Sequence, residues 1–128
     1  MKFGYTIMYV ENVEQTVAFY EAAFGLTRRF IHEGGYAEMD TGDTTLAFVS
    51  LEVAEAAEMP LLKPSLDGPA HAVEVAFVTD DVAASFTQAV DAGAKVVTEP
   101  TKKPWGQTVS YVRDINGFVV EICSPIAT

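Results

Sequence analysis

The chain contains the same pattern twice, and this internal repeat limits the folds open to it more than any other feature. An apolar run at 5–10 is followed by Asn12 and then by apolar residues at helical spacing, up to Gly25. The run at 74–78 is followed by Asp81 and by the same spacing, 69 positions further along the chain. Asn and Asp are favoured helix N-caps, and glycine commonly follows a helix. The sequence therefore predicts a tandem duplication of one strand-helix unit.

Three runs typical of short strands follow each predicted helix. They lie near residues 27–32, 36–41 and 44–50 in the first copy, and near 94–99, 107–112 and 118–123 in the second. Turn residues that tolerate positive φ, such as those at 33–35 and 116–117, separate these runs. Each copy is therefore predicted to fold as a βαβββ module.

The predicted domain organisation is a single domain over residues 1–128. Module one covers 1–51, a connector that contains prolines and a glycine covers 52–69, and module two covers 70–125. The length is that of one ordinary domain. A four-stranded sheet with one helix leaves its other face exposed, so we expect the modules to pair with each other or with a partner chain.

The net charge of −10 disfavours nucleic acids and anionic membranes as partners, because such partners are bound through Lys and Arg. The sequence has no apolar run near the roughly 20 residues that a membrane span needs, and its start lacks the features of a signal peptide. Cys123 is the only cysteine, which excludes an internal disulfide. We therefore expect a cytoplasmic protein.

Two motifs resemble those of the vicinal oxygen chelate superfamily, which includes the glyoxalases and the bleomycin-resistance proteins. The first is segment 9–20, YVENVEQTVAFY, which continues to the Phe-Gly-Leu at 24–26 and is similar to the family's opening strand and helix. The second is segment 111–122, YVRDINGFVVEI, which resembles the family's last hairpin, with Ile115 in place of the usual proline. The resemblance implies an α+β fold in which tandem βαβββ modules form a curved mixed sheet around a cavity.

The resemblance also implies four site positions, one on the first strand and one on the last strand of each module. In this chain they are occupied by Tyr5, Ala47, Glu74 and Glu121. Because side chains alternate along a strand, Ile7 and Tyr9 share the face of Tyr5. These faces are expected to line the implied cavity.

Metal-using members of the family commonly place His and Glu at these positions, and a metal site usually needs three or four donors. Here Ala47 donates nothing, a tyrosine such as Tyr5 is a poor metal ligand, and neither histidine of the chain is in register. We therefore expect no metal or other cofactor. If a divalent metal binds, Glu74 and Glu121 are its predicted ligands.

A glutamate on an otherwise apolar strand that faces a cavity is costly unless it is hydrated, paired or protonated. Glu74 and Glu121 are therefore the candidate catalytic residues, acting either as a general base or as the receptor for a cationic group. The alternative is that both are hydrated, or bonded to Tyr5, without a role in chemistry. Cys123 shares the face of Glu121 and is interpreted as a small buried apolar residue rather than a nucleophile.

The predicted ligand-binding residues are Tyr5, Ile7, Tyr9, Ala47, Trp105, Gln107 and Tyr111. Trp105 lies in a Pro-Trp-Gly turn, where its ring is expected to stack on a planar ligand or, alternatively, to cap the core or a dimer interface.

Three functions are compatible with the resemblance. The favoured one is a small-molecule binding protein of the bleomycin-resistance type, which holds a metabolite or antibiotic in an acidic, aromatic cavity without a metal. The alternative is a glyoxalase-like lyase or isomerase with Glu121 or Glu74 as base beside a weakly held divalent metal. A ring-cleaving dioxygenase is disfavoured, because its iron site needs two histidines in register. The resemblance further implies a homodimer.

Overall fold

The computed structural model describes residues 1–126, and its helices and strands follow the order βαβββ, α, βαβββ. The first module contains β1 (Tyr5–Val10), α1 (Val13–Phe24), β2 (Thr27–His32), β3 (Tyr36–Asp40) and β4 (Thr45–Ser50). A short helix, α2 (Leu51–Ala56), begins the connector. The second module contains β5 (Glu74–Val78), α3 (Val82–Asp91), β6 (Lys95–Lys102), β7 (Thr108–Arg113) and β8 (Val119–Cys123). No helix within residues 1–126 is long and apolar enough to span a bilayer.

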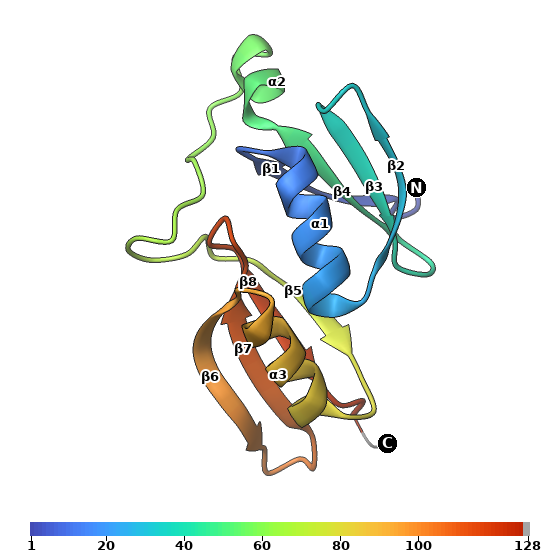
Figure 1. Cartoon of the computed structure of the whole chain (residues 1–128), viewed down its shortest axis with the longest axis vertical. Helices are drawn as coiled ribbons and strands as arrows, with labels where there is room; N and C mark the ends of the chain where they lie inside the picture. Colours follow the sequence, from blue (N-terminus) through green and yellow to red (C-terminus); the bar gives the residue numbers. More distant parts are fainter. Residues whose placement is uncertain (127–128) are drawn as a thin grey trace. The chain divides into compact units, whose positions relative to one another are not determined.

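Each module builds one four-stranded mixed sheet, and the two sheets have the same strand order (Figure 1). The order is β1-β4-β3-β2 in the first and β5-β8-β7-β6 in the second. In each sheet the first strand is parallel to the last strand of its module, and the other pairs are antiparallel. The predicted α+β fold class with tandem βαβββ modules is confirmed.

The chain divides into two compact units. The first comprises Met1–Glu21 and Gly25–Pro64; the second comprises Ala22–Phe24 and the chain from Ser65 onward. The last three residues of α1 therefore belong to the second unit. The boundary in the connector lies between Pro64 and Ser65.

Local sequence explains where the two long helices begin. The Asn12 side chain accepts a hydrogen bond from the backbone N–H of Gln15 at 2.9 Å, and Asp81 does the same for Ala84 at 3.0 Å. In each case a side-chain oxygen satisfies an otherwise unpaired backbone N–H of the first turn, so both residues act as the predicted N-caps. Gly25 closes α1 in the left-handed conformation, with φ of 67°.

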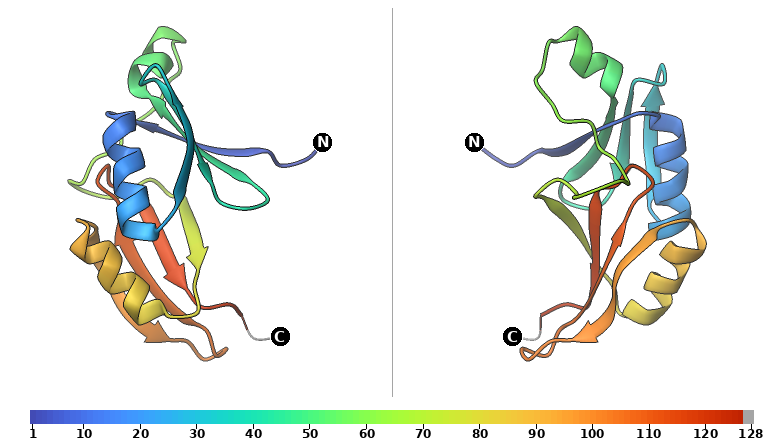
Figure 2. Two further views of the ribbon diagram at one scale, coloured as in Figure 1. Left: turned by 45° about the vertical axis from the view of Figure 1, so that its right-hand side comes forward. Right: turned by 90° about the vertical axis from the view of Figure 1, so that its left-hand side faces the viewer.

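Each sheet buries one face in the core. The opposite face, called the open face below, is only partly exposed. In the first sheet, Met8 and Val10 are buried, and the Tyr20 hydroxyl of α1 lies 3.9 Å from the Met8 sulfur. Figure 2 shows α3 lying along one face of the second sheet, where its contacts are with β6, β7 and β8. Alternation then places Tyr5 and Ile7 on the opposite face of the first sheet, where they are 55% and 44% exposed.

Strand pairing aligns the two modules in the predicted register. Ile7 pairs with Ala47 in the first sheet, and Ala76 pairs with Glu121 in the second. The positions of β1 and β5 differ by 69 (76 minus 7), and those of β4 and β8 differ by 74 (121 minus 47). Ala47 and Glu121 are therefore structurally equivalent positions.

Two side chains of the last hairpin, Asp114 and Arg113, stabilise its turn through hydrogen bonds to the backbone. One carboxylate oxygen of Asp114 accepts hydrogen bonds at 2.9 Å from the backbone N–H groups of Asn116, Gly117 and Phe118. The buried Arg113 donates to the carbonyls of Gly117 (2.9 Å), Ser65 (2.6 Å) and Gly68 (2.8 Å). These bonds hold the turn and fasten the connector to the second module.

Candidate functional site

Two glutamates and a tyrosine gather on the open face of the second sheet. Tyr111 on β7 and Glu121 on β8 are directly paired across the strands. Glu74 on β5 pairs with Val119, two residues before Glu121, and so shares its face. The three side chains come from three neighbouring strands, so the sheet itself sets their spacing.

The two glutamates share a hydrogen bond. Glu74 is exposed as a residue, but the partial burial of its carboxyl group raises the pKa above its ordinary value, and the hydrogen bond and negative charge of Glu121 raise this pKa further. Glu74 therefore holds its proton to a higher pH than an ordinary glutamate, and in that protonated form it can donate to the neighbouring carboxylate.

Tyr111 and Cys123 supply two further protonated groups beside Glu121. Burial raises the pKa of the Tyr111 phenol, and the charge of Glu121 and a hydrogen bond to it raise this pKa further. Burial and a hydrogen bond to Glu121 raise the pKa of the Cys123 thiol to about 11. Both groups therefore stay protonated at neutral pH. The Tyr111 hydroxyl donates toward the Glu121 carboxylate, whereas the Cys123 thiol lies beside that carboxylate and donates to the Phe77 carbonyl at 3.8 Å.

The site continues to the turn before β7. The Trp105 indole N–H donates to the Gln107 side-chain oxygen at 2.9 Å, and the Gln107 amide donates to the Ser124 carbonyl at 3.0 Å. Gln107 is buried and also lies within hydrogen-bonding reach of the Cys123 thiol, whereas Trp105 is 56% exposed. Gln107 thus orients the exposed indole of Trp105 and contacts Cys123, which in turn lies beside Glu121.

The structure gathers the predicted site residues into two groups. Glu74, Trp105, Gln107, Tyr111 and Glu121 belong to the second unit and form the cluster described above. Tyr5, Ile7, Tyr9 and Ala47 share the open face of the first sheet, where Ala47 is fully buried. Glu74, Tyr111 and Glu121 share one face of the second sheet, whereas Trp105 and Gln107 lie in the turn before β7.

A charged network on the first sheet was missed by the sequence reasoning. Glu38 on β3 pairs with Ala47 and so occupies the position that Tyr111 has in the second sheet. Its carboxylate accepts from Arg29 at 3.1 Å and from the Tyr36 hydroxyl at 2.7 Å. Burial is the main reason why the pKa of Tyr36 is raised to about 12, and the hydrogen bond to Glu38 is the second.

Side-chain alternation along β3 was a signal that could have revealed Glu38, because Tyr111 was predicted on the equivalent strand of the second module. Arg29 was harder to place. The pairing of β2 with β3 shifts between Arg28 and Phe30, and this bulge lets Arg29 reach the face of Glu38. Such an irregularity is set by strand pairing and has no local sequence signature here.

The donor set does not fit a metal site of three or four ligands. Among residues 1–126, no three His, Cys, Asp or Glu side chains are placed so as to hold a metal ion. The cluster offers two carboxylates, and its tyrosine and cysteine are held in their protonated forms. The ring of His71 instead stacks on Phe118 at 5.7 Å, and His32 lies 3.9 Å from the Glu33 carboxylate.

Cys123 is expected to resist alkylation in the folded protein. At pH 8 a thiol with a pKa of about 11 has roughly a hundredfold less thiolate than an ordinary cysteine, and only the thiolate reacts. Iodoacetamide labelling followed by mass spectrometry, in buffer and in guanidinium chloride, measures the difference. Equal labelling rates in the two conditions would contradict the environment described for Cys123.

Known proteins resemble this chain along nearly its whole length. The model of the Glyoxalase/Bleomycin resistance protein/Dioxygenase superfamily matches residues 2–122. The uncharacterized protein YwbC of Bacillus subtilis (strain 168) is 28% identical, over 94% of each chain.

Two solved structures show the same fold. A glyoxalase/bleomycin resistance protein/dioxygenase family enzyme from Burkholderia phytofirmans PsJN is similar with a TM-score of 0.84 and 18% identity, covering 99% of this chain and 100% of that one. A glyoxalase-related enzyme from Fulvimarina pelagi is similar with a TM-score of 0.82 and 19% identity, covering 98% of this chain and 88% of that one. At such low identity the similarity concerns the fold alone.

Proposed function

Because the chain belongs to the glyoxalase/bleomycin resistance protein/dioxygenase superfamily, we propose that it is a small-molecule binding protein whose site includes the open face of the second sheet. The observation that carries the proposal is the hydrogen-bonded pair of Glu74 and Glu121, two acids placed side by side where neither helps to pack the core. Such a pair lowers the stability of the folded state when both members ionise, and a bound cation relieves that cost.

The proposed ligand is a metabolite or antibiotic that carries a cationic group and a planar part. The cationic group takes the place of the proton between Glu74 and Glu121, and the Tyr111 hydroxyl continues to donate to Glu121. The exposed ring of Trp105 stacks on the planar part, since its indole N–H is already bound to Gln107. Binding in this proposal needs no metal.

Affinity for a cationic ligand is expected to rise with pH across the pKa of the acid pair. The pKa of Glu74 is raised, so below it the pair is protonated and a cation must displace the proton. Above it both carboxylates are free and the competition disappears. A thermal-shift screen of cationic metabolites and antibiotics supplies the ligand, and calorimetry in two buffers with different heats of ionisation then counts the released protons. Affinity that is independent of pH, without proton release, would contradict the proposal.

A glyoxalase-like lyase or isomerase is the second candidate function, and the same acid pair favours it. A glutamate whose pKa is raised by burial and by a second carboxylate suits a general base, so Glu74 or Glu121 would move a proton of the substrate. In this candidate the two carboxylates would also hold a divalent metal weakly, and that metal would supply a Lewis acid. Stoichiometric metal in elemental analysis of protein purified without chelator, together with turnover, would favour this candidate over simple binding.

The proposal includes a homodimer in the cytoplasm. The open face of the first sheet exposes Tyr5, Ile7 and Phe30, and side chains of this kind are typical of surfaces that a second copy covers. A net charge of −10 leaves nucleic acid outside the proposed partners.

Sedimentation analysis is expected to find a dimer that Ile7→Lys dissociates. The matched control is Val53→Lys, which replaces an exposed valine of α2 and should leave the dimer intact. A monomeric wild type at high concentration would contradict the dimer.

A further inference from the structure

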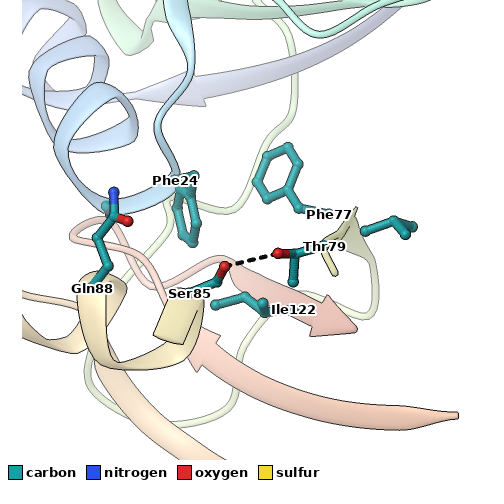
Figure 3. A pocket seen from close by; sticks show the side chains of 8 residues that line it. Phe24, Phe77, Thr79, Ser85, Gln88 and Ile122 are labelled. Atoms are coloured by element: carbon teal, nitrogen blue, oxygen red, sulfur yellow. Dashed lines mark hydrogen bonds between the residues drawn. The ribbon is translucent and has the colours of Figure 1, made fainter. Parts of the chain in front are cut away.

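A hollow of about 170 Å³ lies on the helix side of the second sheet, on the opposite face from the acid pair. Ile122, the neighbour of Glu121 on β8, points into it, because successive side chains of a strand face opposite ways. The hollow belongs to the second unit, and residues of β5, α3 and the end of α1 complete its wall (Figure 3). The proposed function makes no use of this space.

The wall combines two aromatic rings with three uncharged polar side chains. The principal side chains are Phe24, Phe77, Thr79, Ser85, Gln88 and Ile122, none of which carries a charge. The rings of Phe24 and Phe77 lie 5.0 Å apart, tilted by 38°. A charged ligand would lose its hydration here without an opposite charge to replace it, so the lining selects an uncharged molecule.

The hydroxyls of Thr79 and Ser85 lie 3.0 Å apart at one side of the hollow. The Thr79 oxygen also accepts from the backbone N–H of Asp81 at 3.2 Å. Whichever hydroxyl donates to the other, one O–H hydrogen of the pair is not used within it. The Gln88 amide nitrogen donates to the Ala22 carbonyl at 3.0 Å, and this bond orients the side chain beside the hollow. The hydroxyl pair can thus offer both a donor and an acceptor to a ligand.

We propose that this hollow is a second binding site, for an uncharged aromatic molecule of one ring that carries a hydroxyl group, a phenol in chemical class. An engineered apolar cavity of about 150 Å³ in another protein binds benzene, so a space of about 170 Å³ matches one ring in size. The ring packs against Phe24 and Phe77, whose faces and edges favour aromatic partners. The ligand's hydroxyl bonds to the Thr79 and Ser85 pair.

The probe is phenol itself, titrated into the full chain and followed by two-dimensional NMR. Phenol is expected to saturate with a Kd of about 1 mM or tighter, with the largest shifts at Phe24, Phe77 and Ile122. Ser85→Ala should weaken binding about fivefold, the usual effect of one lost hydrogen bond. Ser85→Leu should abolish it by filling the space. The matched control is Thr87→Ala, which removes an exposed hydroxyl from the same helix and should leave the Kd unchanged.

Benzoate and cyclohexanol complete the experiment, because the first adds a charge and the second removes the aromatic ring. Both should bind at least tenfold more weakly than phenol. The proposal is overturned if phenol does not saturate, if benzoate binds as well, or if Ser85→Leu binds phenol like the wild type. Shifts centred on Tyr111 and Glu121 would also overturn it, since phenol would then occupy the acid-pair face instead.

Discussion

Gly117→Ala is expected to destabilise the protein by about 3 kcal/mol or more. A Cβ at this position would lie 2.1 Å from the carbonyl oxygen of Ser65 and 2.6 Å from its carbonyl carbon. The Ser65 carbonyl cannot withdraw cheaply, because Arg113 donates to it at 2.6 Å. Gly117 also has φ of 103°, which a residue with a side chain rarely adopts. Denaturant unfolding measures the change.

The matched control is Gly42→Ala. Gly42 has nearly the same backbone angle, with φ of 101°, but nothing lies within 4 Å of the place that a Cβ atom would take there. Its substitution therefore costs the backbone strain alone, of the order of 1 to 2 kcal/mol. The difference between the two variants isolates the contact of the turn with the connector. Equal losses in the two variants would show that the connector does not press against this turn.

Glu121→Gln is expected to weaken binding of a cationic ligand tenfold or more. The substitution keeps the shape of the side chain but removes the negative charge, and a charge-assisted hydrogen bond contributes roughly 1.5 to 3 kcal/mol. The pKa of Glu74 should fall toward its ordinary value, because the charge of Glu121 no longer opposes its ionisation, although burial still raises it. Calorimetry gives the affinity, and an NMR pH titration follows Glu74.

Folding stability is expected to change little in Glu121→Gln, because an amide is cheaper to bury than a carboxylate beside another acid. Glu99→Gln is the matched control, since it removes one charge from an exposed position on β6 of the same sheet. The control should bind the ligand as the wild type does. Unchanged affinity in Glu121→Gln, together with a large loss of stability, would instead identify Glu121 as a structural anchor.

The features that the sequence predicted well depend on neighbouring residues. Asn12 and Asp81 cap helices through a backbone N–H three positions away, and Gly25 ends α1 with its own positive φ. The repeat of this order along the chain was enough to predict two βαβββ modules. Alternation within a strand was enough to place Tyr5 and Glu121 on the open faces of their sheets.

Tertiary structure decided the contacts between residues that the sequence keeps apart. The bond between Glu74 and Glu121 joins positions 47 residues apart (121 minus 74), and it contributes to the raised pKa of Glu74. Arg113 finds its carbonyl partners in the connector, and the β2 bulge brings Arg29 to Glu38.

The sequence by itself thus determined the elements, their order and the face of each strand, because caps, turns and side-chain alternation act over a few residues. The pairing of the acids, the fastening of the connector and the hollow beside Phe24 and Phe77 arose only in the folded chain. Their energies come from desolvation, charge and packing between distant segments, and these terms exist only once strand pairing has set the distances.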